Sequence, residues 1–113
     1  MNCTSVAVSM EESEGCKILR VGGELTVLGI QPLRQALLDA LDSGCKVVLD
    51  LEKVEEIDLC GLQIIFSGQL TFRKRGLSLL AINIPEGVRT VARWAGYGGD
   101  NSIVSDRPDG MGL

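Results

Sequence analysis

The stretch EEIDLCGLQII, residues 55–65, brings together side chains that could do chemistry. Asp58 ends an apolar run directly before a segment with helical spacing. Its carboxylate could accept hydrogen bonds from the first backbone N–H groups and face the positive end of the helix dipole. Asp58 is then either a helix cap alone, which contributes about 1 kcal/mol, or part of a binding site at a strand-to-helix loop.

Cys60 lies at the same helix start, but it lacks the partners that catalysis needs. The chain contains no histidine to act as a base, and the carboxylates of Glu56 and Asp58 would oppose a thiolate. The sequence has no phosphate loop or nucleophile elbow, and the glycines of GGEL and GYGGD lack the spacing of a dinucleotide motif. We therefore expect no enzymatic activity and no cofactor, with Cys60 as a small space-filling residue.

The four cysteines do not form a metal site by their spacing. They are scattered, without a C-x-x-C pair, whereas a structural zinc site needs four clustered soft ligands. We expect no metal, and we expect the thiols to be free and buried as small apolar groups in a reducing compartment. These residues are Cys3, Cys16, Cys45 and Cys60.

Composition narrows the class of protein. The chain has 113 residues, 45% of them hydrophobic and 23% charged, which suits one globular domain. The net charge of -4 argues against a nucleic-acid partner, which needs a basic face. The sequence shows neither a signal peptide nor a continuous apolar run of membrane-spanning length, so we expect a cytoplasmic protein without membrane insertion.

The periodicities predict alternating strands and helices. Gly22 and Gly23 indicate a bend at the end of the second strand, Pro32 suits the first turn of the first helix, and Gly44 suits its end. We expect an α/β domain over residues 1–104, with a mixed sheet of about four or five strands packed with three or four helices, and a flexible tail at 105–113. The predicted strands are 3–9, 17–25, 46–51, 77–84 and a short 103–105, with a turn at 11–15; the predicted helices are 30–43, 61–75 and 85–96.

Three stretches in this order resemble the STAS domain, the fold of bacterial anti-sigma factor antagonists. They are GGEL at 22–25, PLRQALLDAL at 32–41 and VVLDLEKVEEIDLCGLQII at 47–65. In that family an apolar strand ending in Asp-Leu is followed by a loop, then Asp-Ser-Ser-Gly or Asp-Thr-Ala-Gly, then a helix that starts Gly-Leu. The resemblance covers roughly residues 3–104 and implies a non-catalytic protein-interaction domain.

The sequence departs from the family pattern at the residues of the switch. Leu59 stands where phosphorylated members carry the modified serine or threonine, and Cys60 follows it. Thr26 stands where an aspartate often follows Gly-Glu-Leu. Residues 45–65 contain no hydroxyl side chain that could replace the missing one. The resemblance therefore implies a domain fixed in the equivalent of the unphosphorylated, partner-binding state, since a phosphate would add about -1.5 to -2 charges at this loop.

The helical wheel of residues 61–75 divides the side chains into two faces. Ile64 falls among small and polar neighbours, where it could form a shallow docking surface or be an ordinary exposed apolar residue. Gly68, costly within a helix, indicates a close approach. The predicted core residues are Leu62, Ile65, Phe66, Leu70 and Phe72, and the predicted partner-binding residues are Asp58, Leu59, Cys60, Gly61, Ile64 and Gly68.

The resemblance leaves the partner open. An anti-sigma factor or a kinase-like ATP-binding regulator fits the family pattern best. The alternatives are a STAS subunit of a phospholipid-transport ATP-binding-cassette complex, a chemotaxis-cluster STAS protein and a small-ligand-binding module. The sequence does not indicate the oligomeric state.

Overall fold

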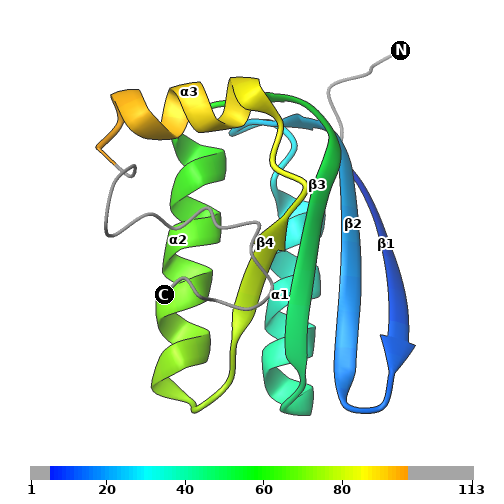
Figure 1. Cartoon of the computed structure of the whole chain (residues 1–113). Coiled ribbons are helices and arrows are strands. Elements are labelled where there is room, and N and C mark those ends of the chain that lie inside the picture. Colours follow the sequence, from blue (N-terminus) through cyan, green and yellow to red (C-terminus); the bar gives the residue numbers. More distant parts are fainter. Residues whose placement is uncertain (1–5, 97–113) are drawn as a thin grey trace.

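The structure is a computed structural model that describes residues 6–96, in which four strands and three helices alternate (Figure 1). The strand order is β1-β2-β3-β4; β1 is antiparallel to β2, and the other neighbours are parallel. The predicted mixed α/β sheet is therefore confirmed. The elements are β1 Val6–Ser13, β2 Cys16–Leu25, α1 Gln31–Ser43, β3 Lys46–Ile57, α2 Leu59–Lys74, β4 Leu79–Ile82 and α3 Glu86–Trp94.

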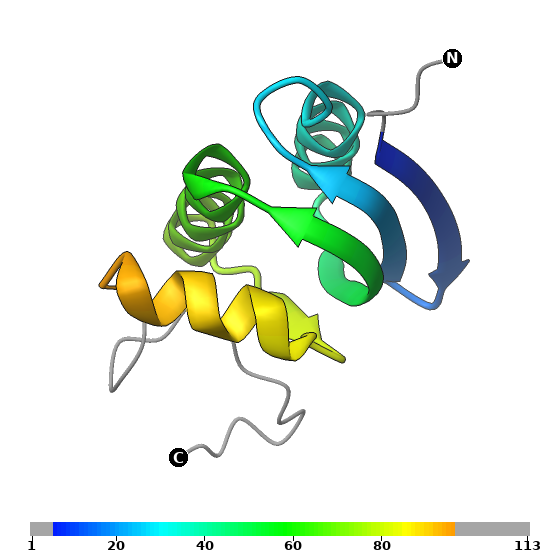
Figure 2. The ribbon, with the colours of Figure 1, turned by 90° about the horizontal axis from the view of Figure 1, so that it is seen from above.

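Helices α1 and α2 lie side by side on one face of the sheet, as the view from above shows (Figure 2). In the middle of β2 and β3 and in β4, every second residue points toward them and is buried, and α3 packs against β3. The main side chains of this core are Leu19, Val21, Val47, Leu49 and Leu51 from the strands, Leu33, Leu37 and Leu41 from α1, and Leu62, Ile65 and Phe72 from α2.

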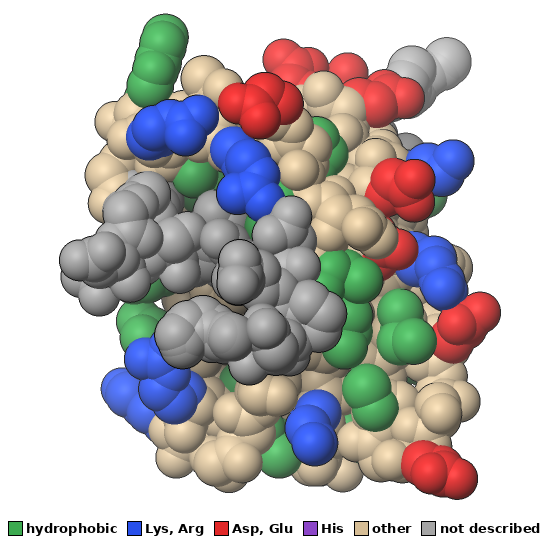
Figure 3. Space-filling model, in the orientation of Figure 1, with side chains coloured by type: hydrophobic (Ala, Val, Ile, Leu, Met, Phe, Trp, Pro, Cys, Tyr) green, Lys and Arg blue, Asp and Glu red, His purple; other side chains and the backbone are tan. Residues whose placement is uncertain are grey.

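The other face of the sheet is seen in Figure 3, where hydrophobic side chains gather over the strands and acidic side chains lie along the upper rim. Ile18, Val48 and Leu80 occupy one row across β2, β3 and β4, since they are register partners. All three are half-buried. Only one face of the sheet thus carries the α1 and α2 layer.

Several sequence-predicted boundaries shift. The predicted turn at 11–15 narrows to Glu14 and Gly15, because β1 continues to Ser13. The third strand runs six residues past its predicted end, since Val54 and Ile57 continue the buried face. Helix α2 begins two residues before Gly61, and β4 is shorter than predicted. The predicted strand at 103–105 and the predicted tail at 105–113 lie outside the described residues.

The structure confirms the helix start, the helix end and the strand irregularity that proline and glycine residues predicted. Pro32 lies in the first turn of α1, and Gly44 ends that helix with a left-handed φ of 73°. The register between β2 and β3 shifts around Gly22 and Gly23, as expected for an irregular strand end.

The predicted core face of α2 is wider than the face that the structure buries. Leu62, Ile65 and Phe72 are buried, but Phe66 is only half-buried and Leu70 is 39% exposed. Leu70 lies about 130° around the helix from the middle of the buried stripe, at 100° per residue. The sheet and α1 cover a narrower arc than the wheel suggested.

Within residues 6–96 the thiols are free, as predicted, but Cys16 is less buried than predicted. Among residues 6–96, Cys45 is buried, whereas Cys16 and Cys60 are half-buried, and all three are free. Cys16 opens β2 beside a turn, and Cys60 lies in the first turn of α2, so both sit at element ends where covering layers are incomplete.

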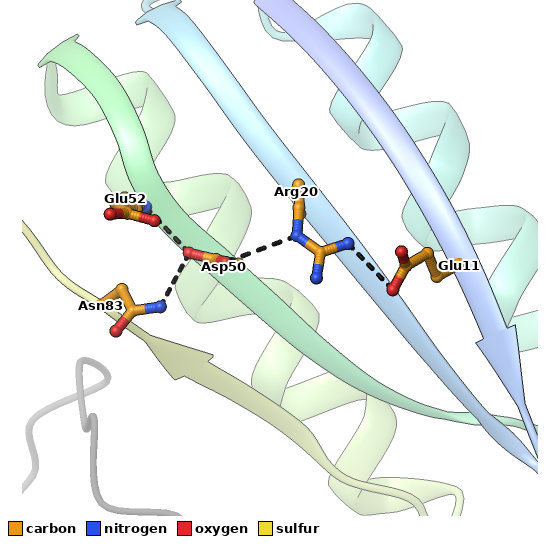
Figure 4. Close-up of polar contacts among 5 residues, drawn as sticks. All are labelled: Glu11, Arg20, Asp50, Glu52 and Asn83. Atoms are coloured by element: carbon orange, nitrogen blue, oxygen red, sulfur yellow. Dashed lines mark hydrogen bonds and ion pairs between the residues drawn. The ribbon is translucent and has the colours of Figure 1, made fainter.

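A chain of polar contacts crosses the sheet on its face away from α1 and α2 (Figure 4). Arg20 Nη1 lies 3.0 Å from Glu11 Oε1, and Arg20 Nε lies 3.8 Å from Asp50 Oδ2. Asp50 Oδ1 also accepts hydrogen bonds from Asn83 Nδ2 at 3.1 Å and from the backbone N–H of Glu52 at 3.0 Å. With its side chain only 12% exposed, Asp50 links β2, its own strand and the residue that follows β4.

We expect Asp50→Ala to lower the free energy of unfolding by about 1–3 kcal/mol, because two hydrogen bonds to a charged acceptor are lost. Urea unfolding followed by circular dichroism measures the change. Glu52→Ala is the matched control, because only its backbone N–H takes part in the Asp50 contact. Equal stability of the two variants would contradict a structural role for the Asp50 carboxylate.

Candidate functional site

Asp58 joins two loops at the end of the sheet where β2 and β3 finish. Its Oδ1 accepts a hydrogen bond from the Gly61 backbone N–H at 3.0 Å, which confirms the predicted helix cap. Its Oδ2 accepts a second bond, from the Val27 backbone N–H at 3.1 Å, and its own N–H donates to the Leu25 carbonyl at 3.3 Å. The carboxylate therefore fixes the β2–α1 loop against the start of α2.

Exposed apolar side chains surround this junction. Leu28 is 78% exposed, Val27 59% and Leu59 51%. We name these three residues the apolar loop patch. Leu59 opens α2 immediately after Asp58, and the Val27 backbone N–H is hydrogen-bonded to the Asp58 carboxylate 31 residues away, so the patch combines the β2–α1 loop with the start of α2. Exposed apolar residues gathered in this way are typical of interaction surfaces.

Sequence reasoning identified Leu59 but missed Val27 and Leu28. The signal was present in TVLGI, where two adjacent large apolar residues follow a strand end and precede a helix. Such a loop is normally polar, so apolar residues there favour a partner over the protein's own core.

Gly61, predicted as a partner-binding residue, is buried. A Cβ at this position would lie 2.8 Å from Ile57 Cγ1 and would collide with the Leu25 carbonyl oxygen. The glycine thus allows α2 to start against the end of β2, and its requirement is explained by packing within the domain.

Charge at the junction is predominantly acidic. Glu24 of β2 and Glu56 of β3 are direct register partners, and none of the ion pairs among residues 6–96 involves either of them. Like charges opposite each other in a sheet are destabilising. A cationic partner group would relieve this repulsion.

Ile64 and Gly68 lie further along α2, in a groove between α1 and α2 with a volume of about 200 Å³. We call this the α1–α2 groove. Ile64 is half-buried and packs against the core rather than standing alone on the surface. The groove is lined by Arg34, Leu37, Leu38, Leu41, Ile64, Ser67, Gly68, Thr71 and Phe72.

Gly68 forms part of the groove, and packing within the domain explains why this position is a glycine. A Cβ there would lie 3.1 Å from Leu79 Cδ2 and 3.5 Å from Leu37 Cδ1. The close approach that the sequence indicated is therefore made to β4 and α1 of the same domain. The remaining candidate, Cys60, is half-buried in the first turn of α2.

No group of three or more histidine, cysteine or acidic side chains within residues 6–96 could hold a metal ion. Over the same residues, no helix has the length and apolarity to cross a bilayer.

Comparison with known families decides the relationship. A family model described as "Mlab, STAS domain" matches residues 8–105. The chain belongs to the STAS domain family. Among curated proteins, none matches this STAS domain closely in sequence.

Solved structures agree on the fold. The STAS domain resembles an anti-sigma factor antagonist from Mycobacterium paratuberculosis, with 20% identity over 82% of this chain and 80% of that chain and a TM-score of 0.69. It also resembles the anti-sigma factor antagonist SpoIIAA in its unphosphorylated form, with 18% identity over 80% of this chain and 81% of that chain and a TM-score of 0.68. The phosphorylated form of SpoIIAA, a Bacillus cell fate determinant, is similar with 17% identity over 80% of this chain and 84% of that chain and a TM-score of 0.65.

We expect Asp58→Ala to lower the free energy of unfolding by about 1–3 kcal/mol, because it removes the cap of α2 and the anchor of the Val27 loop together. Thermal or urea unfolding measures the loss. The same substitution should speed amide hydrogen exchange at Val27 as well as at Gly61.

Glu56→Ala serves as the control, since its exposed side chain makes no contact of this kind. We expect it to change stability by less than about 0.5 kcal/mol. If Asp58→Ala left exchange at Val27 unchanged, the proposed link between the two loops would be wrong.

Proposed function

We propose that this STAS domain is a non-catalytic signalling protein, similar to anti-sigma factor antagonists, that docks constitutively on a protein partner through the Asp58 junction. The observation that carries the proposal is Leu59, half exposed at the first position of α2, directly after the capping aspartate. In phosphorylated members of the family, this position carries the hydroxyl that a partner kinase modifies.

The geometry supports a permanent docking surface. Asp58 has both carboxylate oxygens engaged, so the loops that carry the apolar loop patch are held in place before a partner arrives. A preorganised surface avoids part of the ordering cost of association. Leu59 cannot accept a phosphate, so the charge that would disrupt an apolar interface cannot be introduced at that position.

Three of the predicted partner-binding residues, Asp58, Leu59 and Gly61, lie at the junction, and they have two different roles. Leu59 presents an exposed side chain to a partner, together with Val27 and Leu28. Asp58 and Gly61 position that surface, the first by hydrogen bonds and the second by the close approach of α2 to Leu25. We expect the partner to be an anti-sigma factor or a kinase-like ATP-binding regulator, and the protein to act in the cytoplasm.

The partner surface is expected to be apolar with basic groups at its edge. This follows from the exposed Val27, Leu28 and Leu59 and from the neighbouring Glu24 and Glu56. Complementary charges at an interface rim raise the association rate and make it dependent on salt.

We expect Leu59→Glu to weaken partner binding at least tenfold, because it places a charge in the apolar contact; tenfold corresponds to about 1.4 kcal/mol. The tagged wild-type protein would first be affinity-purified from its native cells and its partners identified by mass spectrometry. Binding of the recovered partner to each variant would then be measured by calorimetry.

Leu70→Glu is the matched control, because Leu70 is a similarly exposed leucine on the same helix but lies away from the junction. It should bind as the wild type does. Equal binding by Leu59→Glu would refute docking at the junction. Recovery of a transporter ATPase in place of a signalling kinase would favour the phospholipid-transport alternative.

A further inference from the structure

We propose that the α1–α2 groove binds an amphipathic helix of the protein partner, which presents apolar side chains to the groove and one carboxylate to Arg34. This proposal rests on the docking function above and adds a second contact region with its own chemistry. It concerns the groove residues alone and not the apolar loop patch.

The lining of the groove combines five large apolar side chains with two hydroxyl groups and a single charge. Among residues 6–96, Arg34 is the only charged residue that lines it, and none of the ion pairs within that range involves Arg34. Leu38 is one of the large apolar side chains that remain exposed. An occupant should therefore combine apolar surface with one anionic group.

The two hydroxyl groups in the groove are already engaged as donors. Ser67 Oγ donates to the Ile64 carbonyl at 3.4 Å, and Thr71 Oγ1 donates to the Ser67 carbonyl at 2.8 Å. Both bonds lie within α2. Their hydrogens are therefore not available to an occupant, and only their oxygens remain to accept a hydrogen bond from it.

This chemistry favours a helix over an extended segment. An extended strand would bring its own backbone N–H and C=O groups against a lining whose hydrogen-bonding side chains are only Arg34 and two hydroxyl groups among the described residues. These are too few to satisfy the strand, and unsatisfied backbone groups are costly. A helix satisfies its backbone internally and offers only side chains. Laying the apolar face of a helix into a groove is a recurring mode of peptide recognition.

The dimensions also favour a helix over an enclosed small molecule. A volume of about 200 Å³ is below the roughly 300–1,000 Å³ of pockets that bury a drug-sized ligand. The lining positions run over eight residues of α1, from Arg34 to Leu41, and over nine residues of α2, from Ile64 to Phe72. At a rise of 1.5 Å per residue these segments are about 10–12 Å long, or two turns of a partner helix.

The charge lies at a defined end of the groove. Helices α1 and α2 run in the same direction, since each follows one of the parallel strands and returns along the same face (Figure 1). Arg34 and Ile64 are therefore both at the end that is nearer to Asp58. The carboxylate of the partner helix should lie at that end, with its apolar anchors extending away from the junction.

Two synthetic amphipathic peptides test the proposal. Each would be about 15 residues long, with leucines at i, i+4 and i+7, and they would differ only by glutamate or lysine one turn before the first leucine. Titration into the isotope-labelled protein, followed by NMR, should shift the amide signals of Leu38, Ile64 and Gly68. We expect the glutamate peptide to bind about threefold to tenfold more tightly than the lysine peptide.

Charge reversal gives the decisive comparison. Arg34→Glu should invert the preference of the two peptides, and Leu38→Lys should weaken both at least tenfold. Leu70→Lys, which changes an exposed leucine of α2 outside the groove, should leave binding unchanged. No binding by either peptide, shifts confined to other residues or an unchanged preference in Arg34→Glu would overturn the proposal.

Other occupants give distinct results, each of which would overturn the proposal. Dodecanoate that shifts the groove signals when the peptides do not would indicate a single-chain amphiphile. Self-association of the wild type that disappears in Leu38→Lys would indicate a second copy of this chain. Failure of the peptides, with partner binding still sensitive to Leu59→Glu, would refute the groove while leaving docking at the junction intact.

Discussion

The two hydrogen bonds accepted by the Asp58 carboxylate are the constraint on which the candidate surface depends. One bond caps α2, and the other holds the loop that follows β2. A loop with two exposed apolar residues would otherwise be free to turn them inward, because water opposes their exposure. By joining the loop to the start of a helix, the carboxylate keeps Val27 and Leu28 beside Leu59. The aspartate therefore acts through the positions of its neighbours more than through its own charge.

The sequence could predict this site only in part. The spacing of Asp58 from Gly61 indicated the cap, because capping is local and its signature lies within three residues. The bond to Val27 joins residues 31 positions apart, and no local pattern encodes such a contact. For this reason the patch was recognised at Leu59 and missed at Val27 and Leu28. The fold was more accessible, since helical and strand periodicities are also local and their alternation restricts the topology.

Prediction was weakest where neighbouring elements decide the outcome. The helical wheel of α2 correctly identified Leu62, Ile65 and Phe72 as buried. It could not show how wide an arc of the helix the sheet and α1 cover, and for this reason Leu70 was wrongly predicted to be in the core. The two glycines of α2 show the same limit. Both were predicted to bind a partner, and Gly68 indicated a close approach, whereas the structure shows that both meet the domain's own elements, Gly61 at β2 and Gly68 at β4 and α1.

Docking that does not depend on phosphorylation can be tested on the wild-type protein itself. The affinity of the wild-type protein for its recovered partner would be measured before and after incubation with a kinase-active partner and ATP, with phosphate incorporation followed by mass spectrometry. Our account predicts an unchanged affinity and no stoichiometric modification of the chain. Stoichiometric phosphorylation, for example at the exposed Ser67 of α2, with a loss of binding would contradict it.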